Sequence, residues 1–379
     1  MYLIGFTGFL LLIYCLLILF YLINWLSIPT KLNSILHEKY STQISIIIPA
    51  RNEEQNIKIC IDSILKQDYP ADLFEIIVVD DHSIDNTAAV VAAYNSESIK
   101  LISLADELNG NAINSYKKKA IEIAVQKAKG TLIVCTDADC IVTPKWLSSI
   151  AAAYEKHGSF FIASPVSFYQ EDSLLKIFQS LDFLTMQGIT GAAVYTKFQS
   201  MCNGANIAYE KRIFNEVGGF KGIDSIASGD DMLLMHKIAK LYPEKVMFLK
   251  NKNAIVRTLP VDSIKGFLNQ RIRWASKADK YDDKKITGVL MVVYFFNVSL
   301  FITTIYTIFD NSFLIPCLLF WLFKTISELA FVIPVASFFG KVKLVWWFIP
   351  LQPFHVVYII ISGWLGKFGK YTWKERQVS

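Results

Sequence analysis

The sequence predicts an α/β fold in which a mostly parallel sheet is joined to transmembrane helices. Strand-like and helix-like patterns alternate in the polar residues 40–285, and three flanking runs, residues 1–30, 286–309 and 344–366, carry no charged side chain. Each run exceeds the roughly 20 apolar residues that cross a hydrocarbon core. Of 379 residues, 53% are hydrophobic and only 19% are charged, and the mean hydropathy is +0.37. These values exclude an intrinsically disordered chain, a secreted disulfide scaffold and a purely soluble enzyme.

The first apolar run is expected to be an uncleaved membrane anchor. A cleaved signal peptide is the alternative, but it needs a basic start and an apolar core of at most about 15 residues. No basic residue precedes Lys31, and the apolar run is far longer than that core. We therefore expect residues 1–30 to stay on the chain as an N-terminal span.

The polar stretch begins with alternating strands and helices. Apolar runs rich in β-branched residues predict buried strands, and apolar residues three and four apart predict helices. The expected order is strand 44–49, helix 56–66, strand 75–79, helix 86–94, helix 120–128 with Gly130 as its cap, and strand 131–136. This order indicates a parallel sheet with right-handed crossovers.

The C-terminal apolar segments leave two questions open. Residues 312–340 contain Lys324 and Glu328, four apart and so on one helix face. They are either functional, as ionisable groups in a membrane often are, or a neutralised pair packed against another span. Three spans after a cytoplasmic domain put the tail outside, whereas its basic residues Lys367, Lys370, Lys374 and Arg376 favour the inside. One later segment is then interfacial or re-entrant.

The charge and the cysteine content of the chain limit its possible partners and its cellular compartment. The net charge of +5 is small and not arranged as a nucleic-acid-binding arm, so we expect no nucleic acid and an anionic membrane surface instead. Six cysteines without metal-type spacing indicate a reducing, cytoplasmic setting. The expected organisation is an anchor at 1–30, a cytoplasmic domain at 40–260, an amphipathic interfacial segment at 261–285, membrane segments at 286–366 and a basic tail at 367–379.

Carboxylates follow two of the expected strands directly. Asp80 and Asp81 come after one strand, and Asp137 and Asp139 follow another. Surface turns are also rich in aspartate, but parallel strands end at one sheet edge, where open sheets bind ligands. Aspartates spaced in this way suit a hard divalent cation shared with phosphate oxygens.

Seven short motifs in this order resemble one family. They are PARNEE at 49–54, VVDDHSID at 78–85, KKKA at 117–120, DADC at 137–140, CNGAN at 202–206, SGDD at 228–231 and QRIRW at 270–274. The chain resembles a membrane-bound family 2 glycosyltransferase with the GT-A fold, a nucleotide-diphospho-sugar transferase with a Rossmann-like sheet. Ceramide glucosyltransferase and the cellulose, chitin and hyaluronan synthases share this pattern.

The resemblance implies roles for individual residues. The nucleotide and donor would be held by Ala50, Glu53, Asp80, Asp81, Lys119 and Asp137. Asp139, with Asp137, would take a Mg²⁺ or Mn²⁺ ion. Asp231 would be the general base, with Asp230 in place of the usual Glu. The diphosphate and acceptor would be flanked by Gln270, Arg273 and Trp274. Tyr116 and His82 stand where glycine is common in the family.

The expected function is an inverting, metal-dependent transfer of a sugar from a nucleotide-diphosphate sugar, UDP-linked by the resemblance, to a membrane lipid. The protein would be a multi-pass cell-membrane enzyme with a cytoplasmic catalytic domain. A processive polysaccharide synthase is the first alternative, and a non-catalytic membrane scaffold is the second. A glycosidase is disfavoured, because its two carboxylates flank a sugar rather than face a phosphate-bound cation.

Overall fold

The chain divides into two compact units in a computed structural model that describes residues 1–30, 40–108, 113–198, 201–224, 226, 229–276, 284–368, 371–373 and 376–378. Unit 1 comprises Met1–Ser27, Gln170–Ile189 and Pro260–Ser379. Unit 2 comprises Ile28–Tyr169 and Thr190–Leu259. The structure therefore differs from the continuous domain expected over 40–260, because the segment Gln170–Ile189 groups with the apolar helices.

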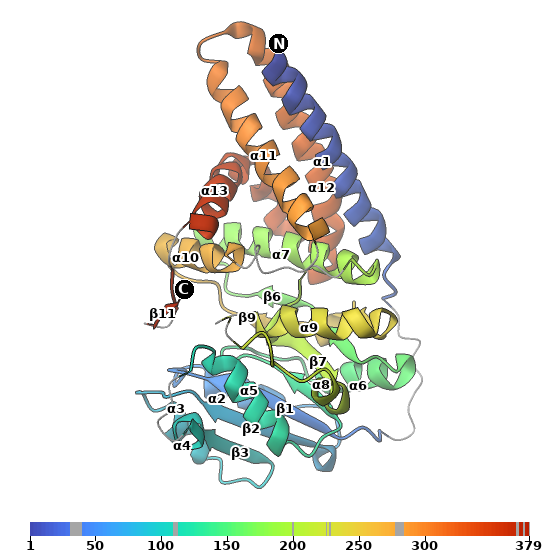
Figure 1. Ribbon diagram of the computed structural model, residues 1–379, viewed down its shortest axis with the longest axis vertical. Coiled ribbons are helices and arrows are strands. Elements are labelled where there is room, and N and C mark those ends of the chain that lie inside the picture. Colours follow the sequence, from blue (N-terminus) through green and yellow to red (C-terminus); the bar gives the residue numbers. More distant parts are fainter. Residues whose placement is uncertain are drawn as a thin grey trace. The chain divides into compact units, whose positions relative to one another are not determined.

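Unit 2 is built on a seven-stranded sheet of order β3-β2-β1-β4-β7-β5-β8 (Figure 1). Its strands are β1 (Ile44–Ala50), β2 (Phe74–Asp80), β3 (Ile99–Ser103), β4 (Leu132–Cys135), β5 (Phe161–Ala163), β7 (Ile207–Glu210) and β8 (Val246–Phe248). A two-stranded sheet pairs β6 (Val166–Phe168) with β9 (Val256–Thr258). The pairs β1–β2, β2–β3, β1–β4 and β5–β8 are parallel, whereas β7 is antiparallel to β4 and β5. The expected mostly parallel sheet is confirmed.

The central strands are apolar throughout because both of their faces are covered. Ile46, Ile47 and Ile48 of β1 are fully buried, and each of the four residues of β4 is at most 2% exposed. Consecutive side chains of a strand point to opposite faces, so an uninterrupted buried run requires packing on both sides of the sheet. This is why these strands were recognisable as continuous apolar runs rather than as alternating ones.

The helices of unit 2 are α2 (Ile57–Ile64), α3 (Thr87–Ala92), α4 (Leu104–Leu108), α5 (Tyr116–Lys127), α6 (Trp146–His157), α8 (Lys211–Glu216) and α9 (Asp230–Leu241), with short 3₁₀ turns η1 (Ala71–Leu73), η2 (Gly204–Asn206), η3 (Pro243–Lys245) and η4 (Lys252–Ala254). Three of these helices, α2, α3 and α5, lie close to the expected positions, and the others had no predicted bounds. Helix α5 begins four residues earlier than the expected 120–128. It therefore includes the three consecutive lysines of the KKKA motif in its first turns.

Gly130 does not cap α5 as expected. The cap position is Ala128 in an extended conformation, and Gly130 has no positive φ angle. Instead, a Cβ atom at Gly130 would lie 2.4 Å from the backbone nitrogen of Ser45, and the Gly130 N–H donates to Ser45 Oγ at 2.8 Å. Glycine is needed here because the chain passes directly against β1 before it enters β4.

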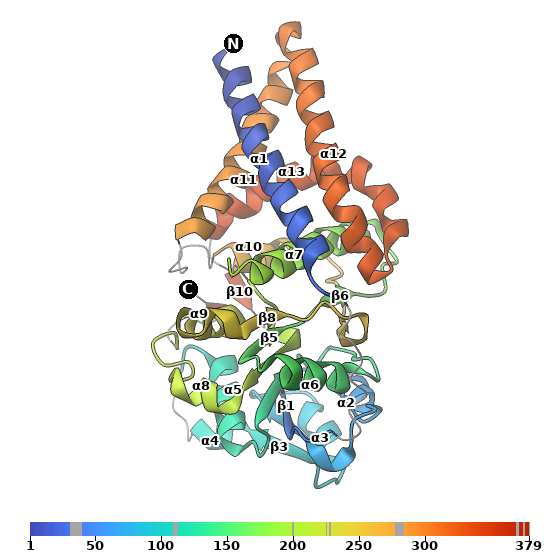
Figure 2. The same ribbon diagram turned by 90° about the vertical axis from the view of Figure 1, so that its right-hand side faces the viewer.

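Unit 1 is a group of apolar helices with two amphipathic ones. It contains α1 (Tyr2–Ser27), the first part of α7 (Leu174–Tyr195), α10 (Ile264–Ala275), α11 (Lys284–Tyr306), η6 (Asn311–Phe313), α12 (Leu314–Phe339), η7 (Val342–Trp347), α13 (Phe348–Phe368) and a hairpin of β10 (Tyr371–Trp373) and β11 (Arg376–Val378). Four helical segments are long and apolar enough to cross a membrane, namely Tyr2–Ser27, Lys285–Tyr306, Asn311–Phe339 and Val342–Lys367. In both views α1, α11 and α12 run side by side, while α13 is inclined to them and lies beside α10 (Figures 1 and 2).

The segment from Gln170 groups with unit 1 because of its apolar stripe. Leu181 of α7 packs with Val332 of α12 and Leu351 of α13 in one buried cluster. A Cβ atom at Gly188 would lie 2.6 Å from Val335, so α7 also approaches α12 closely there. The stripe has helical spacing in the sequence, but spacing alone does not identify the helices against which it packs.

The charged pair of the third apolar segment is fully partnered. Lys324 Nζ lies 2.7 Å from Glu328 Oε1 and donates to Gln352 Oε1 at 2.6 Å. Gln352 and Tyr14 both donate to Glu328. These four side chains come from α1, α12 and α13: Lys324 and Glu328 neutralise each other, and Tyr14 and Gln352 complete their hydrogen bonds. The geometry matches the neutralised-pair alternative.

Some predicted residues lie outside the described part of the chain. They are Ser228 of the SGDD motif, residues 277–283 of the expected interfacial segment, and Lys370 and Lys374 of the basic tail. Helix α10 within that segment is described and is amphipathic as expected.

Candidate active site

The candidate site of unit 2 begins at the carboxyl ends of three neighbouring strands. The register pairs Ala50 of β1 with Asp80 of β2, and Ile47 of β1 with Cys135 of β4. Asp137 follows the end of β4 by two residues. The two aspartate clusters therefore emerge at the same sheet edge, as expected for parallel strands.

Lys117 of α5 joins two of the aspartate motifs. Its Nζ lies 2.7 Å from Asp137 Oδ1 and 3.7 Å from Asp230 Oδ2. Burial alone would lower the pKa of Lys117, but Asp137, Asp230 and Asp231 outweigh burial and raise it above its usual value. Lys117 is therefore a fixed cation between the DADC motif and the GDD sequence.

Asp139 is a buried carboxylate with other carboxylates nearby. Burial, followed by the charges of Asp137 and Glu53, raises the pKa of Asp139 to about 6. Thr258 Oγ1 donates to its Oδ2 at 3.1 Å, and Cys140 Sγ lies 3.5 Å from its Oδ1. Negative charge accumulated in this way favours a bound cation, which would stabilise both ionised aspartates.

The second aspartate pair opens helix α9. Gly229 precedes it with a φ angle of 80°, and Asp230 and Asp231 form the first turn, where the helix dipole favours acidic side chains. Asp231 is held by two backbone donors, because Gly204 N donates to Oδ2 and Met232 N donates to Oδ1, each at 2.7 Å.

The residues expected to hold the nucleotide lie in two facing loops. Asp81 is buried, and its Oδ1 lies 2.9 Å from His82 Nδ1 and 4.0 Å from Arg51 Nη1. Arg51 also donates to the Asp81 carbonyl at 2.9 Å. Asp80 accepts from Ser83 N, and its Oδ1 is buried without a hydrogen-bond partner among the described residues. An acceptor of this kind at the sheet edge suits a ligand hydroxyl.

Glu53 and the glycine replacements lie in the same region. Glu53 accepts from Asn56 Nδ2 at 2.9 Å, and its backbone N–H donates to Thr87 Oγ1 at 2.8 Å. His82 adopts a left-handed conformation, with φ of 55°, and its ring meets that of Tyr116 edge-on at 5.4 Å. Aromatic side chains thus stand together at the two positions where the family commonly has glycine.

The three lysines of the KKKA motif separate into three environments. Lys117 faces the aspartates, whereas Lys118 is buried and donates to the carbonyls of Ile223 and Ile226. Lys119 pairs with Glu122 at 2.8 Å and is 41% exposed. The structure thus brings Lys117, rather than Lys119, to the carboxylates.

The QRIRW residues lie on α10 in unit 1. The Arg271 guanidinium stacks 4.2 Å from the Trp274 ring centroid, and its Nη1 donates to Gln270 Oε1 at 3.1 Å. The Phe183 ring of α7 packs against the Trp274 ring, with the two ring centroids 6.0 Å apart. Arg273 lies in the last turn of the helix.

Three contributors to the unit 2 site were not singled out from the sequence. Thr258 ends β9, Gly204 supplies a backbone donor from within the CNGAN motif, and Arg51 holds the loop after β2. Gly204 lies in the CNGAN motif and Arg51 in the PARNEE motif, so these motifs could have pointed to both residues. Thr258 had no such signal, because its contact with Asp139 spans 119 positions of sequence.

Comparison with known proteins identifies the family. The family model "Glycosyl transferase family 2" matches residues 45–218, and "Glycosyl transferase family group 2" matches residues 132–361, more than half of the chain. The poly(ribitol-phosphate) β-N-acetylglucosaminyltransferase TarS of Staphylococcus aureus is 32% identical over 117 residues, 31% of this chain and 20% of that protein. The chain thus spans a fifth of that relative's length. A poly-β-1,6-N-acetyl-D-glucosamine synthase of Staphylococcus epidermidis is 22% identical over 237 residues, 61% of this chain and 53% of that protein.

A solved structure shares the fold along nearly the whole chain. It is the mannosyltransferase PcManGT of Pyrobaculum calidifontis, in complex with GDP-Man and Mn²⁺, at 18% identity, with a TM-score of 0.58 and 96% of each chain covered. That likeness covers the apolar helices as well as the sheet. With the family matches and the mostly parallel sheet described above, this chain belongs to the family 2 glycosyltransferases and has the GT-A fold.

Proposed function

We propose that this protein transfers one sugar from a nucleotide-diphosphate sugar to a membrane lipid, with inversion at the anomeric carbon. The observation that carries the proposal is the convergence of two aspartate motifs on Lys117, at 2.7 Å from Asp137 and 3.7 Å from Asp230. This arrangement supports a single site for the expected donor-binding and base-bearing residues. A purely structural ion pair would not need Asp139 and Asp231 beside it.

Asp139 and Asp137 fit a divalent cation. The described residues contain no group of three or more His, Cys, Asp or Glu side chains arranged around a metal position. Two carboxylates leave the remaining coordination positions to phosphate oxygens and water, which is how Mg²⁺ is commonly bound with nucleotides. The raised pKa of Asp139 also supports a cation here. Bound Mg²⁺ or Mn²⁺ would supply charge stabilisation to the departing diphosphate.

Asp231 is the proposed general base. Its carboxylate takes the proton of an acceptor hydroxyl while that oxygen forms a bond to the anomeric carbon, and the bond from this carbon to the diphosphate oxygen breaks. The products are the glycosylated acceptor, the nucleoside diphosphate and a protonated Asp231. Attack opposite to the leaving group inverts the configuration. The two backbone donors from Gly204 and Met232 fix the orientation of the carboxylate.

The remaining residues are proposed to hold the two substrates. Ala50, Glu53, Asp80 and Asp81 at the sheet edge would hold the base and ribose. On α10, Gln270, Arg273 and Trp274 would flank the diphosphate and acceptor. The flat indole offers a stacking surface for a sugar. Lys119 stays a proposed donor contact only as part of the KKKA motif, because its own partner is Glu122.

The lipid acceptor and the membrane location rest on unit 1. Helices α1, α11 and α12 are proposed to cross the cell membrane, with the catalytic unit in the cytoplasm. Because α13 is inclined to these three and lies beside α10 (Figures 1 and 2), we propose that it lies at the cytoplasmic interface. The tail after Lys367 then lies on the cytoplasmic side, as the positive-inside rule favours. Protease should remove a C-terminal tag from inside-out vesicles but not from right-side-out vesicles.

A processive polysaccharide synthase is the second candidate. The specific observation in its favour is the match to a poly-β-1,6-N-acetyl-D-glucosamine synthase. Against it stands the small number of apolar helices, four among the described residues, because a polymer channel needs more spans. The two functions differ in product length, which is directly measurable.

The deciding experiment uses the purified full chain in its native lipid extract with Mn²⁺ and a panel of labelled nucleotide sugars. Products are sized by mass spectrometry, and Asp231→Asn serves as the inactive control. A lipid heavier by one sugar residue is expected, and its mass names both donor and acceptor. A ladder of increasing length would establish the synthase. Absence of any product from every donor would reject both.

A further inference from the structure

Arg271 occupies a buried position at the centre of the QRIRW element. Its side chain is 2% exposed, whereas the other polar residues of the element, Gln270 and Arg273, are half-buried. The guanidinium contacts both residues of the element on either side of it, Gln270 through a hydrogen bond and Trp274 through stacking. It also lies 4.9 Å from the Phe267 ring centroid. Arg271 thus connects the two groups that are proposed to meet the substrates.

The counter-ion of Arg271 comes from another helix. Asp182 of α7 has its Oδ2 2.7 Å from Arg271 Nη2, and its side chain is 7% exposed. Burial opposes ionisation of Asp182, but Arg271 and then His355 outweigh it and hold the pKa of Asp182 below its usual value. A buried arginine without such a partner is costly, because a desolvated charge needs compensation. Asp182 therefore determines where the Arg271 guanidinium can lie.

Aromatic rings shield this ion pair from water. The rings of Phe178, Phe267 and Tyr358 pack together. The centroid of Phe178 lies 5.6 Å from that of Phe267 and 5.9 Å from that of Tyr358, and the centroids of Tyr358 and Phe267 are 5.1 Å apart. Low local polarity strengthens an ion pair that is already formed. The geometry of Asp182 and Arg271 is therefore restrained on all three helices, α7, α10 and α13.

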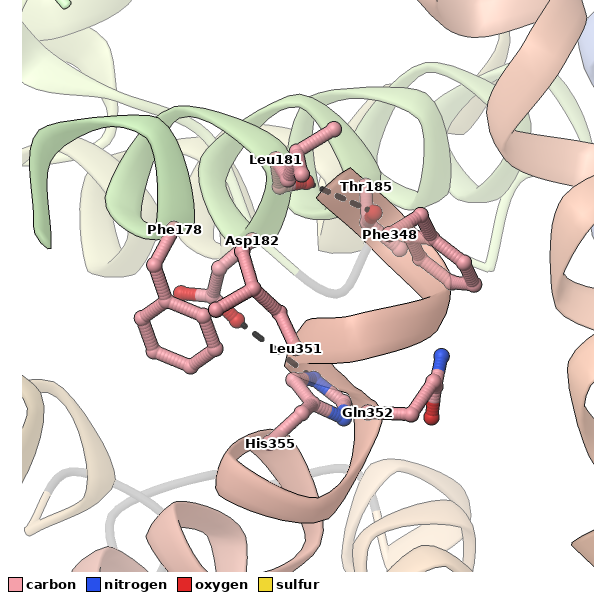
Figure 3. Close-up of a pocket in the computed structure, with 8 residues that line it drawn as sticks. All are labelled: Phe178, Leu181, Asp182, Thr185, Phe348, Leu351, Gln352 and His355. Atoms are coloured by element: carbon pink, nitrogen blue, oxygen red, sulfur yellow. Dashed lines mark hydrogen bonds and ion pairs between the residues drawn. The ribbon is translucent and has the colours of Figure 1, made fainter. Parts of the chain in front are cut away.

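Asp182 has a second, looser contact on α13. Its Oδ1 lies 3.7 Å from His355 Nε2, across a pocket that α7 and α13 line together (Figure 3). His355 is 24% exposed in that pocket, whereas Arg271 is buried. The shorter distance and the deeper burial make Arg271 the main partner. His355 ties the same carboxylate to α13.

From these contacts we infer that Asp182 is a positioning residue for the QRIRW element: through Arg271, it fixes Gln270 and the Trp274 ring in the orientation that the acceptor meets. Its effect on catalysis rests on the proposed function. The geometric part of the inference, that Asp182 fixes the orientation of Trp274, does not depend on the proposed function. Phe183, which follows Asp182 on α7, also packs against the Trp274 ring.

Two substitutions test this inference. Asp182→Asn removes the charge with little change in shape, and Arg271→Lys keeps the charge but loses the planar group that stacks on Trp274. Each should lower kcat/KM for the lipid acceptor by about tenfold or more, because a misplaced contact group costs rate. The affinity for the free nucleoside, which lacks the diphosphate that this element is proposed to flank, should stay unchanged in titration calorimetry. Asp182→Glu, which can restore the ion pair, should recover part of the loss.

A second readout does not depend on sugar transfer. Acrylamide quenching of tryptophan fluorescence, taken as the difference from the same variant carrying Trp274→Phe, reports the accessibility of Trp274. Asp182→Asn should raise that accessibility. If the wild type transfers no sugar but this rise is seen, the proposed function fails and the positioning role stands. If accessibility does not change, the positioning role is wrong whatever the activity.

The matched control breaks another ion pair of unit 1. Glu171 pairs with Lys341 of the segment after α12 and accepts from Ser180 Oγ at 2.9 Å. Glu171→Gln should transfer sugar at the wild-type rate with the wild-type quenching. The double variant Asp182→Leu, Arg271→Met removes both charges without leaving one unpaired. It should fold but stay low in activity with an accessible Trp274. Full recovery in this double variant would show that the pair only neutralises charge, and would overturn the inference.

Discussion

Lys117 Nζ lies 2.7 Å from Asp137 Oδ1, although 20 positions separate the two residues. Asp137 follows β4, whereas Lys117 lies in the first turn of α5, so the contact joins a strand end to a crossover helix. The same ammonium group is 3.7 Å from Asp230 on α9. One cation therefore keeps two aspartate motifs of the site together, and it is the first residue to test.

Lys117→Met should reduce sugar transfer by about tenfold or more. The substitution removes the cation between Asp137 and Asp230, and carboxylates left close together without a counter-charge bind protons more tightly and repel one another. The measurement is the initial rate of transfer at saturating donor. Lys127→Met is the control, because Lys127 is on the same helix and pairs with the surface residue Glu107. Lys119→Met should cost less than Lys117→Met; the opposite order would contradict the geometry.

Asp139→Ala should abolish binding of Mn²⁺ in the presence of a nucleoside diphosphate. Asp139 is a buried carboxylate whose pKa is raised to about 6 by burial, Asp137 and Glu53, and a cation relieves that accumulation of charge. Titration calorimetry with Mn²⁺ measures the loss. EDTA should stop transfer by the wild type, and added Mn²⁺ should restore it. Asp106→Asn, a substitution of an exposed acid on α4, is the control and should bind Mn²⁺ as the wild type does. Undiminished transfer by the EDTA-treated wild type would exclude a metal requirement.

Asp231→Asn should lower kcat by about 10² to 10⁴, the usual contribution of a general base. The amide cannot take the proton of the acceptor hydroxyl. Its oxygen can still accept from one of the two backbone donors, Gly204 N or Met232 N, so the loop should stay in place. Transfer is measured with labelled donor, and nucleotide binding by calorimetry. A variant that binds the nucleotide and retains the wild-type kcat would rule out Asp231 as the base.

Glu75→Gln should destabilise the protein by about 2 kcal/mol at pH 7, in the range for hydrogen bonds to charged groups. Glu75 accepts from Ser45 Oγ and Lys100 Nζ, each at 2.7 Å, and from Lys129 N. Burial raises its pKa, but Lys100, Lys129 N and Ser45 outweigh burial and lower it overall. A depressed pKa means that the stabilisation is complete above the ordinary glutamate value and disappears as the pH falls through the folded-state pKa.

The check on Glu75 is urea unfolding at several pH values, followed by circular dichroism. The wild type and Glu75→Gln should differ most near neutral pH and converge as the pH falls below about 4.5, the ordinary value for this side chain. Parallel stability curves over the whole range would mean that the charge of Glu75 contributes nothing. Glu97→Gln, a change at a residue near β3 in an exposed turn, provides the background.

Lys324→Met should lower the unfolding temperature in lipid or detergent strongly, because it leaves Glu328 buried without its cation. Breaking one side of a buried ion pair costs about 3–5 kcal/mol, whereas replacing both sides by apolar residues is often neutral. The double variant Lys324→Met, Glu328→Leu should therefore recover most of the stability. Lys343→Met, at an exposed residue of η7, is the control. A stable double variant with full transfer activity would establish a structural pair; a stable but inactive one would make the pair functional.

Local patterns in the sequence determined β1, β2 and β4, the helices α2, α3 and α5, and the apolar segments. Continuous apolar runs predicted β1 and β2 within a residue or two of their bounds, because a strand buried on both faces has no polar position. Three of the four apolar segments were recognisable from the absence of charge, whereas residues 312–340 are apolar but contain Lys324 and Glu328. The aspartates after β2 and β4 were placed at one sheet edge by the geometry of parallel strands alone.

Only the tertiary structure decided which neighbours these residues have. Lys117, Lys118 and Lys119 are consecutive and chemically identical, yet successive residues of a helix point about 100° apart, and the packing of α5 alone selects Lys117 for the aspartates. The pairing of Asp182 with Arg271, the contact of Thr258 with Asp139 and the grouping of Gln170–Ile189 with the apolar helices also join distant parts of the chain. Periodicity reports which face of an element is buried, but the partner of that face is determined by register, crossover and helix packing, which no local pattern carries.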